Sequence, residues 1–224
     1  MLAQSQKAPP NPIQKVGDNR FEVGMRMTGA FGQPGLFANS ILMNFLLPIL
    51  GGQLMRLAGM TVVASFPGAT IQHIHRDHQQ LFHEFDNIGP KLPLYAVNVS
   101  IPLIDIDHSI GPTGIWPGSH RWTTDQAPPE TMASVPFLRG DCVLMDYRTL
   151  HAGLPNNSNK ARPILYQVYS REWFFDDNNH RHRAPLDMPL EQIQALPPEL
   201  HLLMMRAYQQ AIRVRQLSGL PMPA

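Results

Sequence analysis

The stretch GMTVVASFPGATIQHIHRDHQQLFHEF, from Gly59 to Phe85, marks the point where the sequence changes from a helical to a β texture. Its first part is rich in Val, Thr and Ser and ends at a Pro-Gly pair, which is typical of a strand followed by a turn. Its second part holds four histidines together with Asp77 and Glu84. This density of imidazoles and carboxylates indicates a metal site, and the local geometry decides which side chains meet there.

Further segments with the same texture predict the fold class. LYAVNVSIPLI, DCVLMDY and PILYQVYS are short, rich in Val, Ile and Tyr, and separated by clusters of Gly, Pro and Asn. The 22 prolines and 16 glycines of the chain suit many short strands joined by turns. We therefore expect a mainly β protein with flanking helices, built as a double-stranded β-helix, which is a jelly-roll or cupin-like barrel.

Segments on either side of this β region have helical features. LFANSILMNFLLPILGG, from Leu36 to Gly52, is apolar, and we expect a buried helix that breaks at Pro48. PPELHLLMMRAYQQAIRVRQ has apolar residues at helical spacing, which favours packing against a core. We expect one domain, with a loose arm over 1–20, a helical part over 21–58, the β-helix core over 59–175, and a C-terminal loop and helix over 176–224.

Composition excludes several classes of function. The chain has 224 residues, 43% of them hydrophobic and 16% charged, which is typical of one globular domain. A net charge of +1 without a basic run argues against nucleic acid as a partner. The start lacks a signal-peptide pattern, and the most apolar segment is too short and interrupted to span a membrane. Cys142 is the single cysteine, which rules out an internal disulfide and a cysteine-based zinc site. We expect a cytoplasmic protein with a small-molecule substrate and leave its oligomeric state open.

Strand geometry selects two ligands from the histidine-rich segment. On a strand, residues i and i+2 project to the same side, so His75 and Asp77 of HRD point together. On a helix the same pair would diverge by roughly 200°. The sequence contains no HExxH pair, which is the helical alternative. The β-type residues that precede the segment favour the strand.

A third ligand is required for the facial arrangement of two histidines and one carboxylate that leaves open positions on non-haem iron. His151 is the candidate, because it follows the strand DCVLMDY and starts a turn-rich loop. Arg162 stands eleven positions later and opens the strand RPILYQVYS. Its planar guanidinium can bind a carboxylate with two parallel hydrogen bonds.

These motifs, in this order, resemble the phytanoyl-CoA dioxygenase-like family of Fe(II)/2-oxoglutarate-dependent oxygenases. The segment GPTGIWPGSHRW, from Gly111 to Trp122, looks like that family's GP…PGSH segment. HAGLPNNSNKARPILYQVY resembles its distal motif, with His151 and Arg162 at the familiar separation. The resemblance covers roughly residues 59 to 175.

The resemblance implies a reaction and a role for each motif residue. His75, Asp77 and His151 would bind Fe(II) and form the catalytic centre, and Arg162 would pair with the C5 carboxylate of 2-oxoglutarate. O2 would be the second co-substrate, and the products would include succinate and CO2. Relatives that halogenate have a small residue at the position of Asp77, so a carboxylate there favours hydroxylation. A small organic or natural-product-like substrate is expected, since a low charge and a pocket rimmed by Met, Phe and Trp suit an apolar molecule.

Several other residues are candidates for the pocket, each with a structural alternative. We assign a co-substrate-binding role to three polar residues, for which plain structural roles are equally open: Gln72, Asn98 and Thr113. A substrate-pocket role is assigned to three more residues, for which core packing is the alternative: His73, Trp116 and Trp173.

Two further functions remain open from the sequence. One is a cupin-type metalloenzyme that does not use 2-oxoglutarate, and the other is a non-catalytic metal- or ligand-binding barrel. Arg162 discriminates against the first, because a barrel without 2-oxoglutarate has no need of this arginine. The second is expected to have lost a ligand or the arginine, and this sequence keeps them all.

Overall fold

The computed structural model describes residues 13–85, 88–134, 136–180 and 185–219. Within these ranges the chain contains nine strands and six α-helices. The strands are β1 (Ile13–Gly17), β2 (Arg20–Gly24), β3 (Met55–Ser65), β4 (Ala96–Pro102), β5 (Thr113–Ile115), β6 (Ala133–Ser134), β7 (Val143–Asp146), β8 (His151–Gly153) and β9 (Arg162–Arg171). The helices are α1 (Pro34–Phe37), α2 (Ser40–Leu50), α3 (Asp177–His180), α4 (Leu190–Gln194), α5 (Pro198–His201) and α6 (Met205–Leu217).

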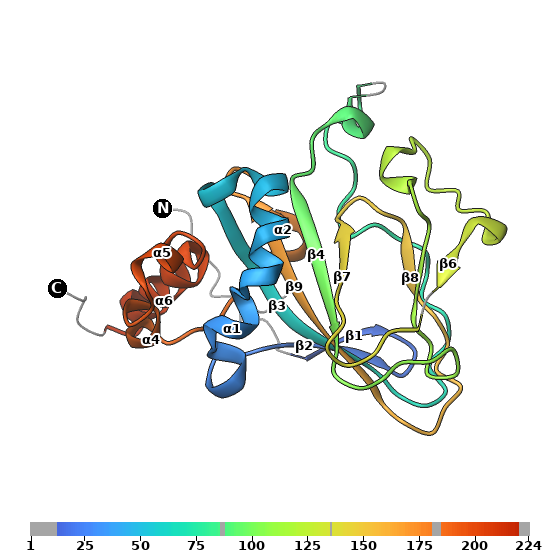
Figure 1. Cartoon of the computed structure of the whole chain (residues 1–224), viewed down its shortest axis with the longest axis horizontal. Helices are drawn as coiled ribbons and strands as arrows, with labels where there is room; N and C mark the ends of the chain where they lie inside the picture. The colour runs from blue at the N-terminus through green and yellow to red at the C-terminus, as the bar shows by residue number, and fades with distance from the viewer. Residues whose placement is uncertain (1–12, 86–87, 135, 181–184, 220–224) are drawn as a thin grey trace, which may run out of the picture.

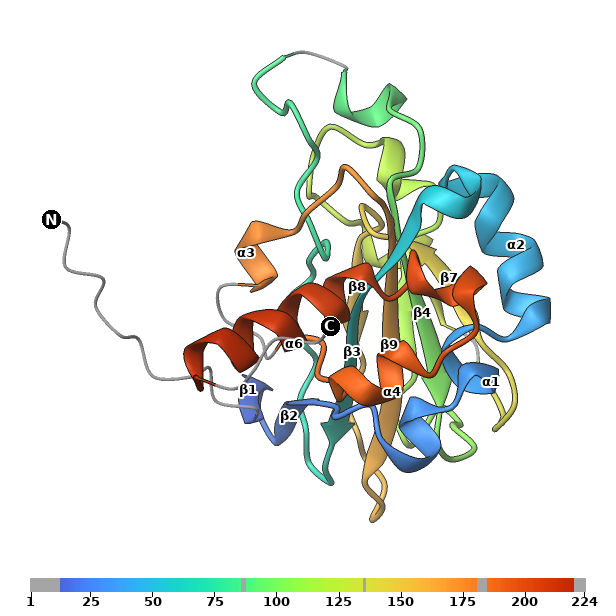
Figure 2. The same ribbon diagram turned by 90° about the vertical axis from the view of Figure 1, so that its left-hand side faces the viewer.

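The strands form two antiparallel sheets (Figure 1). The larger sheet has the order β1-β2-β3-β9-β4-β7, and the smaller sheet has the order β6-β5-β8. The helices α1, α2, α4, α5 and α6 lie on the side of the larger sheet that faces away from the smaller one. Figure 2 shows α4 and α6 in front of β3 and β9. The larger sheet is therefore covered on one face by helices and on the other by the smaller sheet.

The outer face of the larger sheet carries the hydrophobic core. Alternation along β9 places Leu165 and Tyr169 on this face, both at most 1% exposed. They pack with Leu46 of α2 and with apolar residues of α6 in one cluster. The Tyr169 hydroxyl donates a hydrogen bond of 2.8 Å to the carbonyl of Phe37, which ties the end of α1 to the sheet. Each fully buried side chain of this kind stabilises the fold by about 1.5–3 kcal/mol.

The inner face of the same sheet is largely polar, and its residues form rows across the strands. Pairing of β2, β3 and β9 places Arg20, Ser65 and Arg162 in one row. We call these three residues the arginine row; all are at most 1% exposed. The neighbouring rows contain Glu22, Val63 and Ile164, and then Thr61, Tyr166 and Ser100. Charged and hydroxyl groups thus line the space between the two sheets.

The chain changes sheets between β3 and the histidine-rich segment. β3 ends at Ser65, Pro67 and Gly68 form a turn, and the following segment runs beside β8. Its bridge to β8 is antiparallel: His75 N donates to the His151 carbonyl at 3.0 Å, and His151 N donates to the His75 carbonyl at 2.9 Å. The expected strand is therefore an extended segment with one isolated bridge, because the turn separates it from β3.

The N-terminal boundaries differ from those expected. Residues 13–20 are not a loose arm, because β1 and β2 form a hairpin that pairs with β3; residues 1–12 lie outside the described part of the chain. The part over 21–58 is only partly helical, since it contains most of β2 and the start of β3. The turn at Asp18 and Asn19, the latter with φ of 48°, is the local signal for this hairpin.

Helix α2 also departs from the expectation. It begins at an Asn39 cap, whose side chain accepts hydrogen bonds from the backbone of Ile41 and Leu42, and ends at Gly51 with φ of 91°. Pro48 lies inside the helix, which continues to Leu50 rather than breaking. The helix buries only one face, since Ile41 is 69% exposed.

The C-terminal part follows the expected helical pattern with two additions and one exception. α3 and α4 precede α5 and α6 in what was expected to be a loop. Leu203, Met204 and Ala207 are buried in the core, as the periodicity predicts, whereas Val214 is 50% exposed. Within the described ranges, every helix is too short or too polar to cross a lipid bilayer.

Candidate metal centre and its cavity

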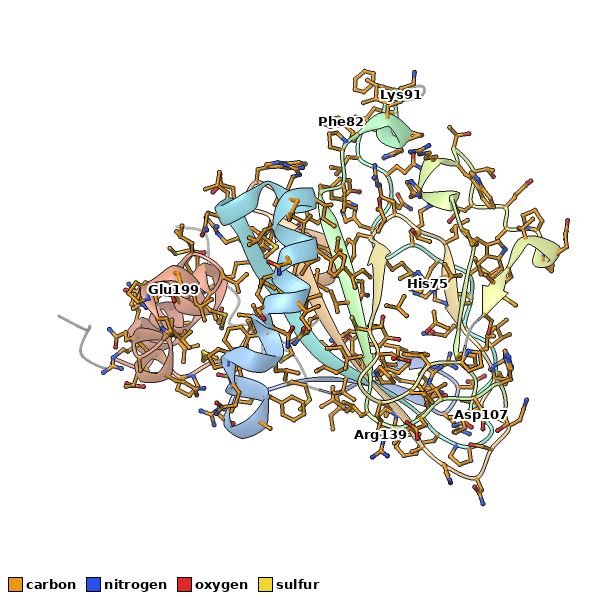
Figure 3. All side chains as sticks on the ribbon, viewed as in Figure 1. His75, Phe82, Lys91, Asp107, Arg139 and Glu199 are labelled. Atoms are coloured by element: carbon orange, nitrogen blue, oxygen red, sulfur yellow. The ribbon has the colours of Figure 1, made fainter. Side chains whose placement is uncertain are left out.

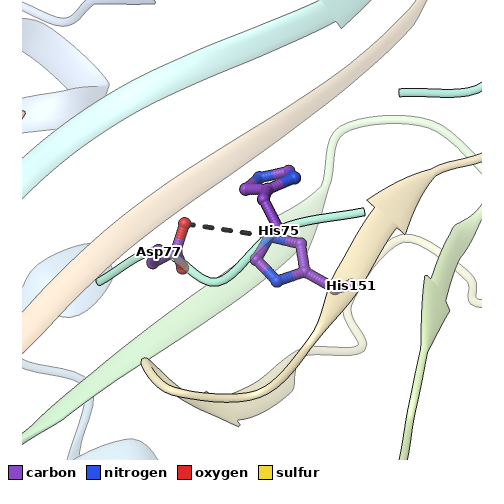
Figure 4. A group of neighbouring side chains, drawn as sticks. All are labelled: His75, Asp77 and His151. Atoms are coloured by element: carbon purple, nitrogen blue, oxygen red, sulfur yellow. Dashed lines mark ion pairs between the residues drawn. The ribbon is translucent and has the colours of Figure 1, made fainter. Parts of the chain in front are cut away.

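Three potential metal ligands from two parts of the chain converge between the sheets (Figure 4). His75 and Asp77 come from the segment that follows β3, and His151 is the first residue of β8. One ligating atom from each side chain lies within 4.8 Å of the other two. Figure 3 shows His75 in the interior, far from Phe82 and Arg139 at the periphery. Two imidazoles and a carboxylate in one small volume are a ligand set that suits a divalent transition metal.

Backbone contacts orient both imidazole rings. His75 Nδ1 lies 2.8 Å from the His73 carbonyl oxygen, and His151 Nδ1 lies 3.0 Å from the Thr149 carbonyl oxygen. Only a protonated nitrogen can donate to a carbonyl, so in the neutral rings the lone pair is on Nε2. His151 Nε2 is 3.7 Å from Asp77 Oδ1. His151 therefore presents Nε2 toward the carboxylate, and one ligating nitrogen of His75 lies within 4.8 Å of the ligating atoms of both partners.

Two asparagines hold Asp77 in place. Asn98 Nδ2, on β4, donates to Asp77 Oδ2 at 2.8 Å, which leaves Oδ1 toward His151. Asn179 Nδ2, on α3, donates to the Asp77 backbone carbonyl at 2.9 Å. Outer contacts of this kind fix the orientation of a ligating side chain. Asn98, which was predicted to bind the co-substrate, thus also positions Asp77, a candidate metal ligand.

Electrostatics keep His75 neutral. Burial, followed by the nearby His151, lowers the pKa of His75 to about 4. A neutral imidazole has a free lone pair, and a protonated one has none. His75 can therefore bind a cation at neutral pH without first losing a proton.

A cavity of about 540 Å³ opens beside the three ligands. Its wall includes four polar residues that were assigned from the sequence to co-substrate or substrate binding: Gln72, His73, Asn98 and Thr113. It also includes Glu22 and Asn179, and its apolar side chains are three valines. The composition predicted a pocket rimmed by Met, Phe and Trp. The wall is polar instead, because the inner face of the larger sheet is polar.

The two tryptophans assigned to the pocket lie elsewhere. Trp116 is 2% exposed and its Nε1 donates to the Pro128 carbonyl at 2.9 Å, within a small cluster that contains Leu150. Trp173 is 62% exposed and contacts the rings of Tyr95 and Phe174. Neither indole lines the cavity, so these two assignments are corrected to a core position and a surface position.

Gln72 joins three segments at the wall of the cavity. Its Nε2 donates to the Val16 carbonyl at 2.9 Å, and its Oε1 accepts from Gly153 N at 3.1 Å. Its own backbone N–H donates to the Gly153 carbonyl. Both ends of the side-chain amide are therefore occupied, which favours a structural role within the wall.

Arg162 is buried without a carboxylate partner. Its Nη1 donates to the Gly111 carbonyl, and its Nε has no hydrogen-bond partner. Among the described residues, no carboxylate lies within ion-pair distance of its guanidinium. Its charge acts on the Tyr166 hydroxyl, and both Tyr166 and Thr113 line the cavity. Burial lowers the pKa of Arg162, as is expected for a cation removed from water.

Sequence reasoning missed a second buried arginine in the same row. Arg20 Nη2 donates to the Leu154 carbonyl at 3.0 Å and to the Thr70 carbonyl at 3.3 Å. Burial and then the charge of Arg162 lower the pKa of Arg20 to about 10. Predicting the position of Arg20 from the sequence would have required the register of β2, β3 and β9, and no local sequence pattern gives that register.

Arg76, between the two ligands of the HRD segment, was also missed. Its side chain is 4% exposed and points away from the metal ligands to the loop that contains PGSH. It donates to five acceptors, which are Asp125 Oδ1 and the carbonyls of Ser119, Trp122, Thr124 and Arg148. We call Arg76 and these acceptors the arginine clamp. The Ser119 hydroxyl in turn accepts from Leu150 N at 2.8 Å, next to His151.

Comparison with known proteins agrees with this geometry. A family model described as phytanoyl-CoA dioxygenase (PhyH) matches residues 15–164. "Dioxygenase aneA" of Aspergillus aculeatus is 32% identical over 145 residues, which are 62% of this chain and 46% of that protein. "Multifunctional dioxygenase ausE" of Emericella nidulans is 30% identical over 122 residues, which are 50% of this chain and 41% of that protein. The matches thus span less than half the length of these curated relatives.

Solved structures share the fold. HygX from Streptomyces hygroscopicus, solved with nickel and 2-oxoglutarate bound, superposes with a TM-score of 0.59 at 14% identity, covering 80% of this chain and 83% of that one. The epimerase SnoN from nogalamycin biosynthesis, described as non-haem and α-ketoglutarate-dependent, superposes with a TM-score of 0.52 at 20% identity, covering 70% and 63%. The jelly-roll architecture expected from the sequence is confirmed. With the family model matching most of its length, this chain belongs to the phytanoyl-CoA dioxygenase family.

Proposed function

We propose that this protein is an Fe(II)- and 2-oxoglutarate-dependent dioxygenase that hydroxylates a small organic molecule and releases succinate and CO2. The observation that carries the proposal is the convergence of His75, Asp77 and His151 at the wall of a cavity. Membership of the phytanoyl-CoA dioxygenase family supports it. Fe(II), 2-oxoglutarate and O2 are the cofactor and co-substrates that the proposal requires.

The residues present fit these groups. His75, Asp77 and His151 would hold a metal through three ligating atoms, which is the number that leaves positions for co-substrates in a site of this ligand type. Buried polar atoms without hydrogen-bond partners occur at Arg162 Nε, Thr113 Oγ1 and Asn98 Oδ1. A carboxylate or keto oxygen would accept hydrogen bonds from Arg162 Nε and the Thr113 hydroxyl, whereas Asn98 Oδ1 is an acceptor and would require a donor. The cavity therefore suits an acidic, oxygen-rich ligand beside a metal.

In this proposal the chain binds and orients, and the bound groups supply the oxidation. Iron with 2-oxoglutarate and O2 supplies the oxidising chemistry. His75, Asp77 and His151 hold the metal, with Asn98 and Asn179 fixing Asp77 through 2.8 Å and 2.9 Å hydrogen bonds. Arg162 pairs with the distal carboxylate of 2-oxoglutarate.

The polar wall supports a substrate with hydrogen-bonding groups. Glu22 of β2 is 5% exposed and lines the cavity together with Thr61, His73 and Asn179. A hydroxyl- or amine-bearing natural-product-like molecule can form hydrogen bonds with such groups, whereas a hydrocarbon cannot. This replaces the apolar substrate expected from composition. The single-domain organisation and the cytoplasmic location remain predictions.

The alternatives are a cupin-type metalloenzyme that does not use 2-oxoglutarate and a non-catalytic metal- or ligand-binding barrel. The buried Arg162 argues against the first, since it has no carboxylate partner among the described residues and is costly without one. The complete set of three ligands argues against the second.

Anaerobic titration tests the proposal. Metal-free protein is loaded with Fe(II) and then with 2-oxoglutarate. The measurement is the weak visible absorption band, at about 500 nm, that a keto acid gives when it chelates iron in such a site. The band is expected in the wild type and in the control Glu191→Ala, whose carboxylate is exposed on α4. It is expected to be absent in Asp77→Ala and to require more 2-oxoglutarate in Arg162→Gln. Iron binding without a band at any 2-oxoglutarate concentration would favour the two alternatives.

A further inference from the structure

The arginine row has one more cation than the proposed function uses. Arg20 and Arg162 flank Ser65 on paired strands, so their side chains project from the same face of the larger sheet. Their relative exposures are 0% and 1%. Two fully buried guanidinium groups on neighbouring strands are unusual, because arginine is rarely fully buried unless it is paired.

Among the described residues, no carboxylate lies within ion-pair distance of either guanidinium. Arg20 donates to the Ser65 hydroxyl and to the carbonyls of Thr70, Gly153 and Leu154, at distances from 3.0 to 3.4 Å. Its Nε, like that of Arg162, is buried without a hydrogen-bond partner. Carbonyls satisfy single donors but carry no net charge. Burial and the charge of Arg162 lower the pKa of Arg20 to about 10, so the two cations repel each other.

Glycine at position 153 allows Arg20 to reach the wall of the cavity. A β-carbon built on Gly153 would lie 2.7 Å from Gln72 Oε1 and 2.9 Å from both Arg20 Cζ and Arg20 Nη1, closer than real β-carbons approach other atoms. Gly153 itself lines the cavity. The Arg20 guanidinium therefore lies directly behind the backbone of β8, next to the space that the proposed function assigns to 2-oxoglutarate.

We propose that Arg20 and Arg162 together form a two-guanidinium site for the distal carboxylate of the dicarboxylate co-substrate. A carboxylate has about four lone-pair positions and can accept hydrogen bonds from both groups. Its negative charge offsets the repulsion between the two arginines. The inference rests on the proposed function and adds Arg20 to it as a binding residue.

The alternative is that Arg20 is only structural, because its hydrogen bonds join β2 to the segments that carry the metal ligands. The two roles predict different ligand dependence. A binding role acts on ligands that have the distal carboxylate, and a structural role acts on the metal and on every keto acid alike. A pair of ligands with and without that carboxylate therefore separates them.

The experiment measures the affinities of Fe(II)-loaded protein for 2-oxoglutarate and for 2-oxobutanoate under anaerobic conditions, using the visible keto-acid band. 2-Oxobutanoate has the same chelating end but lacks the distal carboxylate. For Arg20→Gln we expect a loss of about tenfold or more for 2-oxoglutarate and less than about twofold for 2-oxobutanoate. The Fe(II) affinity is expected to stay within about twofold of the wild type.

Arg20→Lys provides a second variant that keeps the charge but loses the planar fork. It is expected to weaken 2-oxoglutarate binding by roughly threefold to tenfold, again without a matching effect on 2-oxobutanoate. Arg139→Gln is the control, since Arg139 is exposed and pairs with Asp105. It is expected to change neither affinity.

Equal losses for both keto acids, or a weaker Fe(II) affinity in both Arg20 variants, would overturn the inference in favour of a structural role. Unchanged 2-oxoglutarate binding in both variants would overturn it as well, while the proposed function stands. A wild-type protein that binds Fe(II) but not 2-oxoglutarate would instead overturn the proposed function, and the two-guanidinium site with it.

Discussion

The arginine clamp and the arginine row place the same side chain in two opposite situations. Arg76 of the clamp is 4% exposed and donates to five acceptors, one of which is the carboxylate of Asp125. Arg20 and Arg162 of the row are more deeply buried, have no carboxylate partner among the described residues, and each keep a buried Nε without an acceptor. The clamp has a complete set of partners within the protein, and the row does not.

This difference separates a structural arginine from a binding one. A guanidinium whose donors are all directed at protein oxygens has little left for a ligand, and its loss leaves several acceptors unsatisfied. A buried cation without an anion lowers the stability of the free protein, and that cost is recovered when an anion binds. The clamp therefore holds the HRD segment to the loop that contains PGSH. The two arginines of the row are the ones proposed to bind a carboxylate of the co-substrate. Mutations in the two regions should have opposite signatures.

The largest expected effect is that of Arg76→Leu on stability. The change removes one buried charge from Asp125 and leaves four backbone carbonyls without their donor, and breaking such a network costs about 3–5 kcal/mol. Urea denaturation of the metal-free protein measures the free energy of unfolding. Arg139→Leu, at an exposed position, is the matched control and should change it little. A loss below about 1 kcal/mol in Arg76→Leu would show that the clamp does not hold the fold together.

The second prediction concerns Arg162→Leu, where stability should respond to the ligand rather than to the mutation. Removing an unpaired buried cation should leave the metal-free protein as stable as the wild type or more stable by up to about 2 kcal/mol. Saturating 2-oxoglutarate with Fe(II) should stabilise the wild type by about 2.7 kcal/mol at 100 times the dissociation constant, and this gain should be absent in the variant. Anaerobic thermal unfolding with and without the co-substrate measures both. A metal-free variant that is several kcal/mol less stable would contradict the distinction between the row and the clamp.

The candidate metal ligands and the architecture could be predicted from the sequence because few residue types are able to ligate a metal. His75, Asp77 and His151 are brought together as the spacing and the resemblance predicted. The β-type segments near β3, β4, β7 and β9 likewise gave the correct kind of fold. In both cases the information lies in short runs of neighbouring residues, which the sequence displays directly.

The arginine row and the position of the tryptophans could not be read in the same way. Arg20 approaches Arg162 only because β2, β3 and β9 pair in one particular register, and a shift by one residue would turn Arg20 to the other face. Trp116 and Trp173 have the same side chain, yet one is 2% exposed and the other 62%. An indole suits a pocket wall, a core and a surface cluster alike, so composition alone cannot place it.

A third prediction tests how far the clamp reaches toward His151. Ser119→Ala removes the hydroxyl that accepts from Leu150 N at 2.8 Å, and Ser119 is fully buried. An unsatisfied buried N–H costs about 1–3 kcal/mol, and we expect a loss in that range by urea denaturation. The contact lies one residue from His151, so the Fe(II) affinity should also fall. Ser218→Ala, beyond the end of α6, is the control and should alter neither quantity. A loss of stability without any change in Fe(II) affinity would limit the clamp to a structural role remote from the metal.

The smallest effect is expected for Asp125→Asn, which removes only the charge opposite Arg76. Asp125 is 69% exposed, so water screens its ion pair with Arg76 despite the 2.7 Å contact. Exposed ion pairs contribute about 0–1 kcal/mol, and the four carbonyl acceptors of Arg76 remain. We therefore expect a loss of less than about 1 kcal/mol in urea denaturation, and less still at high salt. A loss as large as that of Arg76→Leu would mean that the clamp depends on its one carboxylate rather than on its carbonyls. The contrast with the arginine row would then be one of charge pairing alone, and supplying a carboxylate near Arg20 by mutation should convert the row into a second clamp.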